Sequence, residues 1–284
     1  MGRSIYEDAV VVVTGAGSGL GKAMALELGE RKAFVVVADI DEASAIKTAD
    51  EITDRGGRAE ATACDVTIES DLTDIVLRAV EGHGRLDIMI NNAGIAITGE
   101  AHHRSREEVR RVFDVNFWGV YHGTMAAYET MRRQRSGTIV NIASIAGLIP
   151  LPHVTAYVAS KHAVVGFSTS LAIEAARSGV RIMTVCPGSV RTGLLRRGRP
   201  EERSSTVAPR RSALRPMEAE RAARLILEGV QKRKPVIVIP FLLPRLYRLV
   251  RALSPRLYNF LSSEWFELVF RRSRKAARRD STEG

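Results

Sequence analysis

Short apolar runs alternate with longer stretches of helical period along most of this chain. The runs are rich in β-branched residues and show little polar alternation, which is typical of strands buried on both faces of a parallel sheet. Alternation of this kind predicts an α/β fold with a doubly wound parallel sheet and helices on both sides. In such sheets, ligands bind beyond the carboxyl ends of the strands, where the winding reverses.

The residue ranges of these elements follow from the same pattern. The expected strands are Ala9–Thr14, Val35–Asp39, Ile88–Asn91, Thr138–Ile142, Arg181–Cys186 and Val236–Pro240. The expected helices include Lys22–Glu30, Ala43–Arg55, Asp71–Glu81, Glu107–Met131 and a late helix from Pro216 to about Gln231.

The net charge of +10 lies in the last third of the chain, because residues 1–190 carry −4 and residues 191–284 carry +14. No stretch of roughly 18 apolar residues is free of charge, which argues against an ordinary membrane-spanning helix. The first residues lack the features of a signal peptide. Cys64 and Cys186 lie far apart in apolar surroundings, so we expect reduced core thiols in a cytoplasmic protein.

A glycine-rich loop, Thr14 to Gly21, follows the first expected strand and opens the first expected helix. Glycines let a backbone approach a pyrophosphate, whose charge the amides of a helix N-terminus stabilise. A Walker loop is excluded because Lys22 is followed by alanine, and the usual Rossmann spacing would place its third glycine at Leu20. The pattern T-G-x-x-x-G-x-G predicts a dinucleotide site; a purely structural turn is the alternative.

Asp39 ends the second expected strand, about 20 residues past this loop, where a carboxylate can bind the adenosine ribose hydroxyls. The same carboxylate would repel a 2′-phosphate, and neither Ser18 nor Ile40 offers a basic group to receive one. The sequence therefore favours NAD over NADP.

Tyr157 and Lys161 lie one turn apart in a stretch of helical character, so their side chains share a face. A nearby ammonium stabilises a phenolate, and we expect it to lower the pKa of Tyr157. The spacing Y-x-x-x-K is common on helix surfaces, so it gains weight only together with Ser144, which lies just beyond the fourth expected strand.

In this order the motifs resemble the classical short-chain dehydrogenase/reductase family, over about residues 8–192. The resemblance implies one Rossmann-type domain, a seven-stranded parallel sheet and hydride transfer with a nicotinamide cofactor. Besides the glycine loop, Ser144 and the Tyr157–Lys161 segment, it rests on Asp65-Val66, Asn91-Asn92-Ala93-Gly94, Asn116 within V-N-F, and Pro187-Gly188.

The resemblance also implies residue roles. Tyr157 would be the general base in oxidation and the general acid in reduction, Lys161 would bind the nicotinamide ribose, and Ser144 would hold the substrate oxygen. Asn116 would position a water in the proton relay. The implied cofactor contacts are Gly15, Ser18, Gly19, Leu20, Gly21, Asp39, Ile40, Asp65, Val66, Asn92, Ala93, Gly94, Tyr157, Lys161, Pro187, Gly188, Val190 and Thr192.

The histidines show no convincing metal spacing, so we expect no metal site; His153, between Ser144 and Tyr157, is a weak candidate for substrate contact. Nucleic acid is not an expected partner, because the basic residues of the last third interleave with leucines. Residues 188–215 form the expected substrate lid, within a catalytic domain spanning 1–240.

Residues 241–284 form an expected basic, amphipathic, helical extension. Its apolar stripes are edged by arginines, and the sequence leaves two interpretations open. The segment 241–275 either lies in a membrane interface or packs on the enzyme core or a second subunit. Related hydroxysteroid and retinol dehydrogenases often combine such a tail with lipid-like substrates, so the resemblance favours an apolar substrate.

The sequence thus predicts an NAD-dependent oxidoreductase that interconverts a secondary alcohol and a ketone on a steroid- or lipid-like substrate. The alternatives are an NADPH-dependent ketoreductase, including a 3-oxoacyl type served by an acidic carrier protein, and a non-catalytic dinucleotide-binding module. The resemblance further implies a homodimer or homotetramer built on the helices that carry Asn116 and Tyr157.

Overall fold

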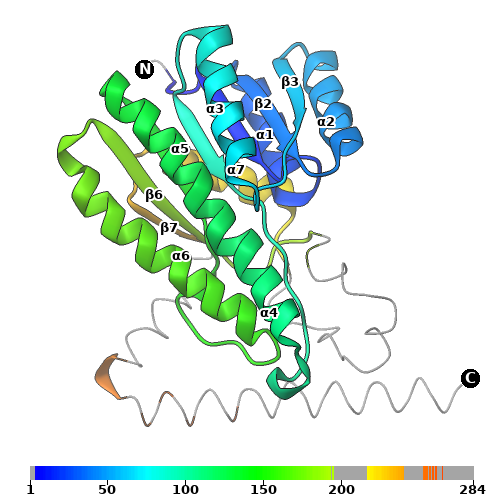
Figure 1. Ribbon diagram of the computed structural model, residues 1–284, viewed down its shortest axis with the longest axis vertical. Helices are drawn as coiled ribbons and strands as arrows, with labels where there is room; N and C mark the ends of the chain where they lie inside the picture. The colour runs from blue at the N-terminus through cyan, green and yellow to red at the C-terminus, as the bar shows by residue number, and fades with distance from the viewer. Residues whose placement is uncertain are drawn as a thin grey trace, which may run out of the picture.

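A single sheet of seven parallel strands, in the order β3-β2-β1-β4-β5-β6-β7, forms the centre of the computed structural model (Figure 1). The structure describes residues 4–192, 194 and 216–239, and isolated positions between 252 and 264. The strand order reverses between β1 and β4, which confirms the doubly wound fold and places the switch point at these two strands. The strands are β1 Val10–Thr14, β2 Phe34–Asp39, β3 Arg58–Ala63, β4 Ile88–Asn91, β5 Gly137–Ile142, β6 Val180–Pro187 and β7 Val236–Ile239.

Helices cover both faces of the sheet (Figure 1). Helices α1 (Gly19–Glu30), α2 (Glu42–Asp54) and α7 (Ala219–Gln231) lie on one face. Helices α3 (Glu69–His83), α5 (Gly119–Gln134) and α6 (Thr155–Glu174) lie on the other.

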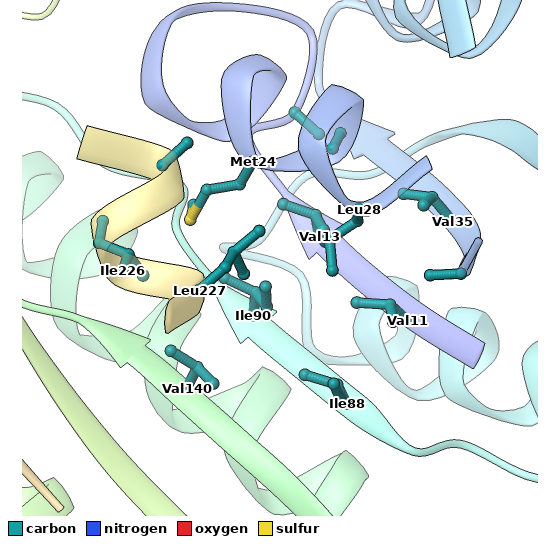
Figure 2. Close-up of a cluster of buried hydrophobic side chains, with 14 of the residues drawn as sticks. Val11, Val13, Met24, Leu28, Val35, Ile88, Ile90, Val140, Ile226 and Leu227 are labelled. Atoms are coloured by element: carbon teal, nitrogen blue, oxygen red, sulfur yellow. The ribbon is translucent and has the colours of Figure 1, made fainter. Parts of the chain in front are cut away.

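The strand side chains alternate between these two layers, which explains why the central runs are continuously apolar. Val11 and Val13 of β1 pack in the layer of α1 and α7, whereas Val10 and Val12 pack in the opposite layer. Figure 2 shows Met24 and Leu28 of α1 and Ile226 and Leu227 of α7 meeting the first of these layers.

Strand β3 is the seventh strand that the family resemblance implied but the apolar runs did not reveal. It pairs only with β2, at the edge of the sheet, with Phe34 opposite Arg58. Its residues are exposed or partly buried throughout, and only the small side chains of Ala59 and Ala61 pack against the core. An edge strand of this kind leaves little hydrophobic signal in a sequence.

The single helix expected over Glu107–Met131 is wrong in one respect, because it is interrupted. Helix α4 (Arg106–Phe113) passes through a π-helical turn, η2 (Asp114–Trp118), into α5. Such turns insert one extra residue into a helix and occur frequently at functional sites. Ser105 and Glu108 cap the start of α4 reciprocally, which fixes where this helical unit begins. Short 3-10 turns η1 (Ala101–His103), η3 (Ile145–Gly147) and η4 (Ala175–Arg177) complete the described helices.

Both cysteines are buried and free, as predicted. Burial, with added repulsion from neighbouring aspartates, raises the pKa of Cys64 to about 12, so its thiol is unreactive at neutral pH. No helix among the described residues is long and apolar enough to cross a membrane. The expected lid beyond Thr192 and the expected extension 241–284 lie, apart from isolated positions, outside the described residues.

Candidate active site

The glycine loop brings β1 and α1 into very close contact at the switch point. Gly15 has a left-handed backbone, with φ of +64°, and a Cβ there would lie 2.8 Å from Cα of Ala93. A Cβ on Gly21 would overlap the carbonyl oxygen of Gly15 and lie 2.5 Å from Nδ2 of Asn92. Only glycine fits at either position, for different steric reasons.

Thr14 and Asn92 tie this loop to the end of β4. Oγ1 of Thr14 accepts hydrogen bonds from the backbone amides of Asn92 (3.0 Å) and Ala93 (3.1 Å). Nδ2 of Asn92 in turn donates to the carbonyl oxygens of Thr14 (2.9 Å) and Gly15 (3.2 Å). The predicted residues Asn92 and Ala93 therefore form one wall beside the glycine loop.

The N-terminus of α1 is arranged to receive an anion. Its N-cap, Ser18, makes no capping hydrogen bond to the helix, and its first turn contains no acidic residue. The positive end of the helix dipole is therefore not neutralised by α1 itself. This end, together with the close glycine backbone, fits a dinucleotide pyrophosphate.

Asp39 lies at the carboxyl end of β2, next to the loop. Its Oδ2 accepts from the amide of Gly17 (2.9 Å) and its Oδ1 from the amide of Asp41 (3.0 Å). The backbone carbonyl of Asp39 accepts from Cys64 (2.9 Å), which brings Asp65 and the buried Val66 alongside. Ile40 is 69% exposed directly after Asp39, so its side chain is available to a ligand.

The opposite side of the site follows β6. The amide of Gly188 donates to the carbonyl of Ile239 (2.6 Å), and Val190 pairs with Met217 in an isolated parallel bridge. This path carries Thr192 back to the glycine loop, where a Cβ on Gly19 would lie 3.2 Å from Cβ of Thr192. Of the predicted cofactor residues in this segment, Thr192 is thus the one that the structure places against the glycine loop.

Ser144, Tyr157 and Lys161 converge at the ends of β5 and β6. Oγ of Ser144 accepts from the amide of Ala146 (3.1 Å) and donates to the carbonyl of Pro187 (3.4 Å), and Ser144 is close enough to Tyr157 to influence the pKa of its phenol. Nζ of the buried Lys161 lies 5.8 Å from the centroid of the Tyr157 ring. The three side chains predicted to act together do lie together.

In the chain without a cofactor, the pKa of Tyr157 is raised rather than lowered. Burial raises the pKa of Tyr157 above its ordinary value, and the hydrogen bond with Ser144 opposes this shift only in part. Desolvation disfavours the phenolate and the ammonium alike, and Nζ is directed to the carbonyl of Ile142 at 2.8 Å. The phenol is therefore held in its protonated form.

Asn116 occupies the middle of the π turn η2 and is fully buried. Its Oδ1 accepts from the amide of Ile95 (2.8 Å) and its Nδ2 donates to the carbonyl of Ile95 (2.9 Å). Gly94 lies between Asn116 and Lys161, since a Cβ there would be 3.2 Å from Oδ1 and 3.6 Å from Nζ. Asn116 and Lys161 therefore lie on either side of Gly94.

Comparison with known proteins identifies the architecture around this site. A family model described as short chain dehydrogenase matches residues 9–203. The chain belongs to this family. It is 38% identical over 223 residues to cyclohexanol dehydrogenase of Acinetobacter sp., covering 72% of this chain and 87% of that protein. An uncharacterized oxidoreductase of Thermotoga maritima is 40% identical over 193 residues, covering 68% of this chain and 76% of that protein.

A solved structure extends the match to nearly the whole fold. The short-chain dehydrogenase/reductase of Burkholderia phymatum in complex with NAD superposes with a TM-score of 0.78 at 31% identity, covering 89% of this chain and 96% of that one. The predictions of family, fold and oxidoreductase class are confirmed by these matches.

The sequence assigned no role to several polar residues in and around the site. Thr14 was treated as the start of a glycine loop, although its hydroxyl organises two strand ends. Ser160 bridges Asn116 and Tyr157, as described below. A buried polar network also joins β4, β5, α5 and α6. Asn91 and Asn141 could have been recognised as part of it, because each is a polar residue inside an otherwise apolar strand. The members of this network are Asn91, Thr124, Asn141 and Ser168.

The histidines do not enter the site as a group. Ligand atoms of Glu100, His102 and His103 lie within 4.8 Å of one another, but all three residues are exposed on the turn around η1. Proximity on an exposed turn is common without a metal, so we assign none there. The backbone of His153 has φ of +60°, and its carbonyl accepts from Gly99 (2.8 Å), which joins the loop before α6 to the segment after β4.

Burial of Lys161 has a measurable consequence for this dehydrogenase. Desolvation lowers the pKa of Lys161 to about 8, against its ordinary 10.5. Between these pH values the unfolded chain binds more protons than the folded one, so the free energy of unfolding rises with pH. Titration of Lys161 alone raises the free energy of unfolding by roughly 3 kcal/mol between these two pH values.

We expect Lys161→Met, which removes the buried charge at similar length, to abolish that slope. Denaturant titrations of both proteins between about pH 7.5 and pH 10 measure how the free energy of unfolding depends on pH. The difference between the two proteins at each pH removes the contribution of the other titrating groups. Parallel stability curves for the two proteins would contradict the assignment of a strongly lowered pKa to Lys161.

Proposed function

We propose that this chain is an NAD-dependent dehydrogenase that interconverts secondary alcohols and ketones on apolar, cyclic substrates, with Tyr157 as the general acid and base. The observation that carries the proposal is the convergence of Ser144, Tyr157 and Lys161 beside Asn116, at the mouth of a dinucleotide site. A site built only to bind a dinucleotide needs no hydroxyl, phenol and buried lysine in one cluster.

The proposed chemistry requires one proton and one hydride. When bound, the oxidised cofactor would accept the hydride and the reduced cofactor would donate it. The oxidised form would also bring a positive charge that lowers the pKa of a nearby phenol. In reduction, Tyr157 donates its proton to the ketone oxygen; in oxidation, the phenolate takes the alcohol proton. Ser144 holds the substrate oxygen within reach of that phenol, and Lys161 binds the nicotinamide ribose.

The substrate class rests on the segment between Ser144 and Tyr157. This segment is predominantly apolar, and Ile145, Ile149 and Leu151 in it are partly buried rather than fully packed in the core. The similarity to a cyclohexanol dehydrogenase supports a ring bearing a secondary alcohol. A steroid- or lipid-like substrate is the larger member of the same class.

A panel of secondary alcohols tests the proposal. We expect reduced cofactor to accumulate when the protein is incubated with NAD and cyclohexanol, larger cycloalkanols or sterols. Tight binding of NAD with no turnover on any member of the panel would instead favour a dinucleotide-binding module.

Asp39 is expected to set the cofactor preference. Asp39→Asn keeps the shape and one acceptor but removes the charge that would repel a 2′-phosphate. We expect the ratio of NADP to NAD affinity to rise at least about tenfold, since hydrogen bonds to a charged group contribute roughly 1.5–3 kcal/mol. Titration calorimetry with both cofactors measures the ratio. Tighter binding of NADP than NAD by the unaltered protein would contradict the choice of NAD and favour the ketoreductase alternative.

We also propose that the basic tail meets an anionic membrane surface. Leu253 and Phe260, two described positions of the tail, are 77% and 60% exposed, as expected for an amphipathic helix in an interface. The protein should sediment with anionic but not with neutral liposomes. Replacing Arg271, Arg272 and Arg274 by glutamate should abolish this sedimentation without changing turnover. A variant truncated after Pro240 that still sediments with lipid would contradict the proposal.

Assembly through the helices that carry Asn116 and Tyr157 is supported by a partly exposed aromatic cluster. Trp118 is 46% exposed, packs edge-on against Tyr121 at 5.6 Å, and Tyr121 contacts Phe167 of α6 at 5.4 Å. A second copy of the chain covering this surface is the occupant we propose, as a homodimer or homotetramer, and light scattering measures it directly. The cytoplasmic location stays a prediction from the sequence.

A further inference from the structure

Ser160 is fully buried on α6, between two of the proposed catalytic residues, and has no assigned role. Its Oγ accepts a hydrogen bond from Nδ2 of Asn116 (3.1 Å) and donates one to the backbone carbonyl of Tyr157 (2.8 Å). The hydroxyl therefore links the π turn η2 to the first turn of α6.

The direction of each bond in this link is fixed by the backbone of Ile95. Its amide donates to Oδ1 of Asn116 (2.8 Å) and its carbonyl accepts from Nδ2 (2.9 Å), so the side-chain amide cannot be reversed. The second hydrogen of Nδ2 must then point at Ser160. A hydroxyl has one hydrogen, and that of Ser160 is donated to the backbone carbonyl of Tyr157.

We propose that Ser160 is a positioning residue that sets the distance between Tyr157 and the loop carrying Gly94 and Ile95. The inference rests on the proposed function, since it assumes that Tyr157 transfers the proton. Three segments meet at this hydroxyl: the loop after β4 through Ile95, the π turn through Asn116, and α6 through Tyr157. A small displacement among them alters proton transfer more than binding, because the cofactor is held chiefly by other residues.

Ser168 provides a matched control. It is also fully buried on α6, two turns further on, and its Oγ accepts from Nδ2 of Asn141 at 3.0 Å. Replacing either serine by alanine removes one buried hydroxyl that pairs with an asparagine amide. Only Ser160 pairs with a residue of the proposed site, so the two variants separate positioning from general stability.

The experiment compares Ser160→Ala, Ser160→Thr and Ser168→Ala in the full chain. For Ser160→Ala we expect kcat to fall by roughly tenfold to a hundredfold, with a shifted pH dependence of kcat, while KM and the affinity for NADH change less than about threefold. Ser160→Thr restores the hydroxyl and should recover most of kcat. Ser168→Ala should keep both kcat and its pH profile, with a comparable loss of thermal stability.

Indistinguishable kcat values and pH profiles for Ser160→Ala and Ser168→Ala would overturn the inference. Should Ser160→Ala not fold, Ser160→Cys keeps the volume with a weaker hydrogen-bonding group; an unchanged kcat and pH profile in that variant would overturn it equally. Tyr157→Phe distinguishes a failure of the positioning role of Ser160 from a failure of the proposed function. If that variant is inactive while the serine variants behave alike, only the positioning role fails; if it remains fully active, the proposed function itself fails.

Discussion

Tyr157→Phe should lose at least about a hundredfold, and up to about ten-thousandfold, in kcat, the range that general acid–base catalysis contributes. The phenylalanine ring keeps the packing but has no proton to donate or accept. Tyr157 and Ser144 are the two groups proposed to contact the substrate oxygen, so this oxygen would also lose one of its two partners. Steady-state turnover of a substrate from the alcohol panel measures the loss.

The same variant should still bind the cofactor. The glycine loop, Asp39 and Asn92 hold no contact to the phenol, so we expect the dissociation constant of NADH to change less than about threefold. Fluorescence titration with NADH is the control. A variant that binds NADH normally and turns over at the unaltered rate would remove Tyr157 from the mechanism.

Gly21→Ala should disrupt the dinucleotide site and the fold together. The added methyl group would overlap the carbonyl of Gly15 and press on Asn92, both of which belong to the junction between β1, β4 and α1. Overpacking of a close backbone contact costs about 1–3 kcal/mol, and the shifted loop would no longer present its amides to a pyrophosphate. We expect a lower denaturation midpoint and at least about a hundredfold weaker binding of NAD.

Gly82→Ala is the matched control for this substitution. Gly82 also lies in a helix, α3, but a Cβ there meets nothing within 4 Å. Alanine in an open helical position stabilises a protein by roughly 0.5–1 kcal/mol relative to glycine. Opposite signs of the two stability changes are therefore expected. A Gly21→Ala protein as stable as Gly82→Ala, with normal affinity for NAD, would show that the close approach at Gly21 is not required.

Most strands that the sequence reveals have side chains buried on both faces of the sheet, whereas β3, the strand it hides, does not. β1 and β2 are β-branched runs because both helix layers pack on them. In β3, Arg58 and Glu60 are exposed at the edge of the sheet, so this strand has no continuous apolar run that would identify it in the sequence. Only the family resemblance predicted a seventh strand.

The site shows a similar division. Asp39 was singled out by its position at the end of the second strand, and Tyr157 and Lys161 by their spacing together with the family resemblance. The electrostatic balance at Tyr157 could not be recognised in this way, since it depends on how completely the folded chain excludes water from the phenol. The π turn at Asn116 and the bridge through Ser160 are also tertiary features, because one inserted helical residue and one buried hydroxyl leave no periodic pattern.

Isotope transfer from substrate to cofactor tests the central claim most directly. The protein is incubated with NAD and a panel alcohol, such as cyclohexanol, that carries deuterium at the carbinol carbon, and the reduced cofactor is analysed by mass spectrometry. The account predicts one deuterium in each molecule of NADH formed, and one molecule of ketone for each NADH. Cofactor that binds and returns unchanged from every alcohol, or NADH formed without the label, would contradict it.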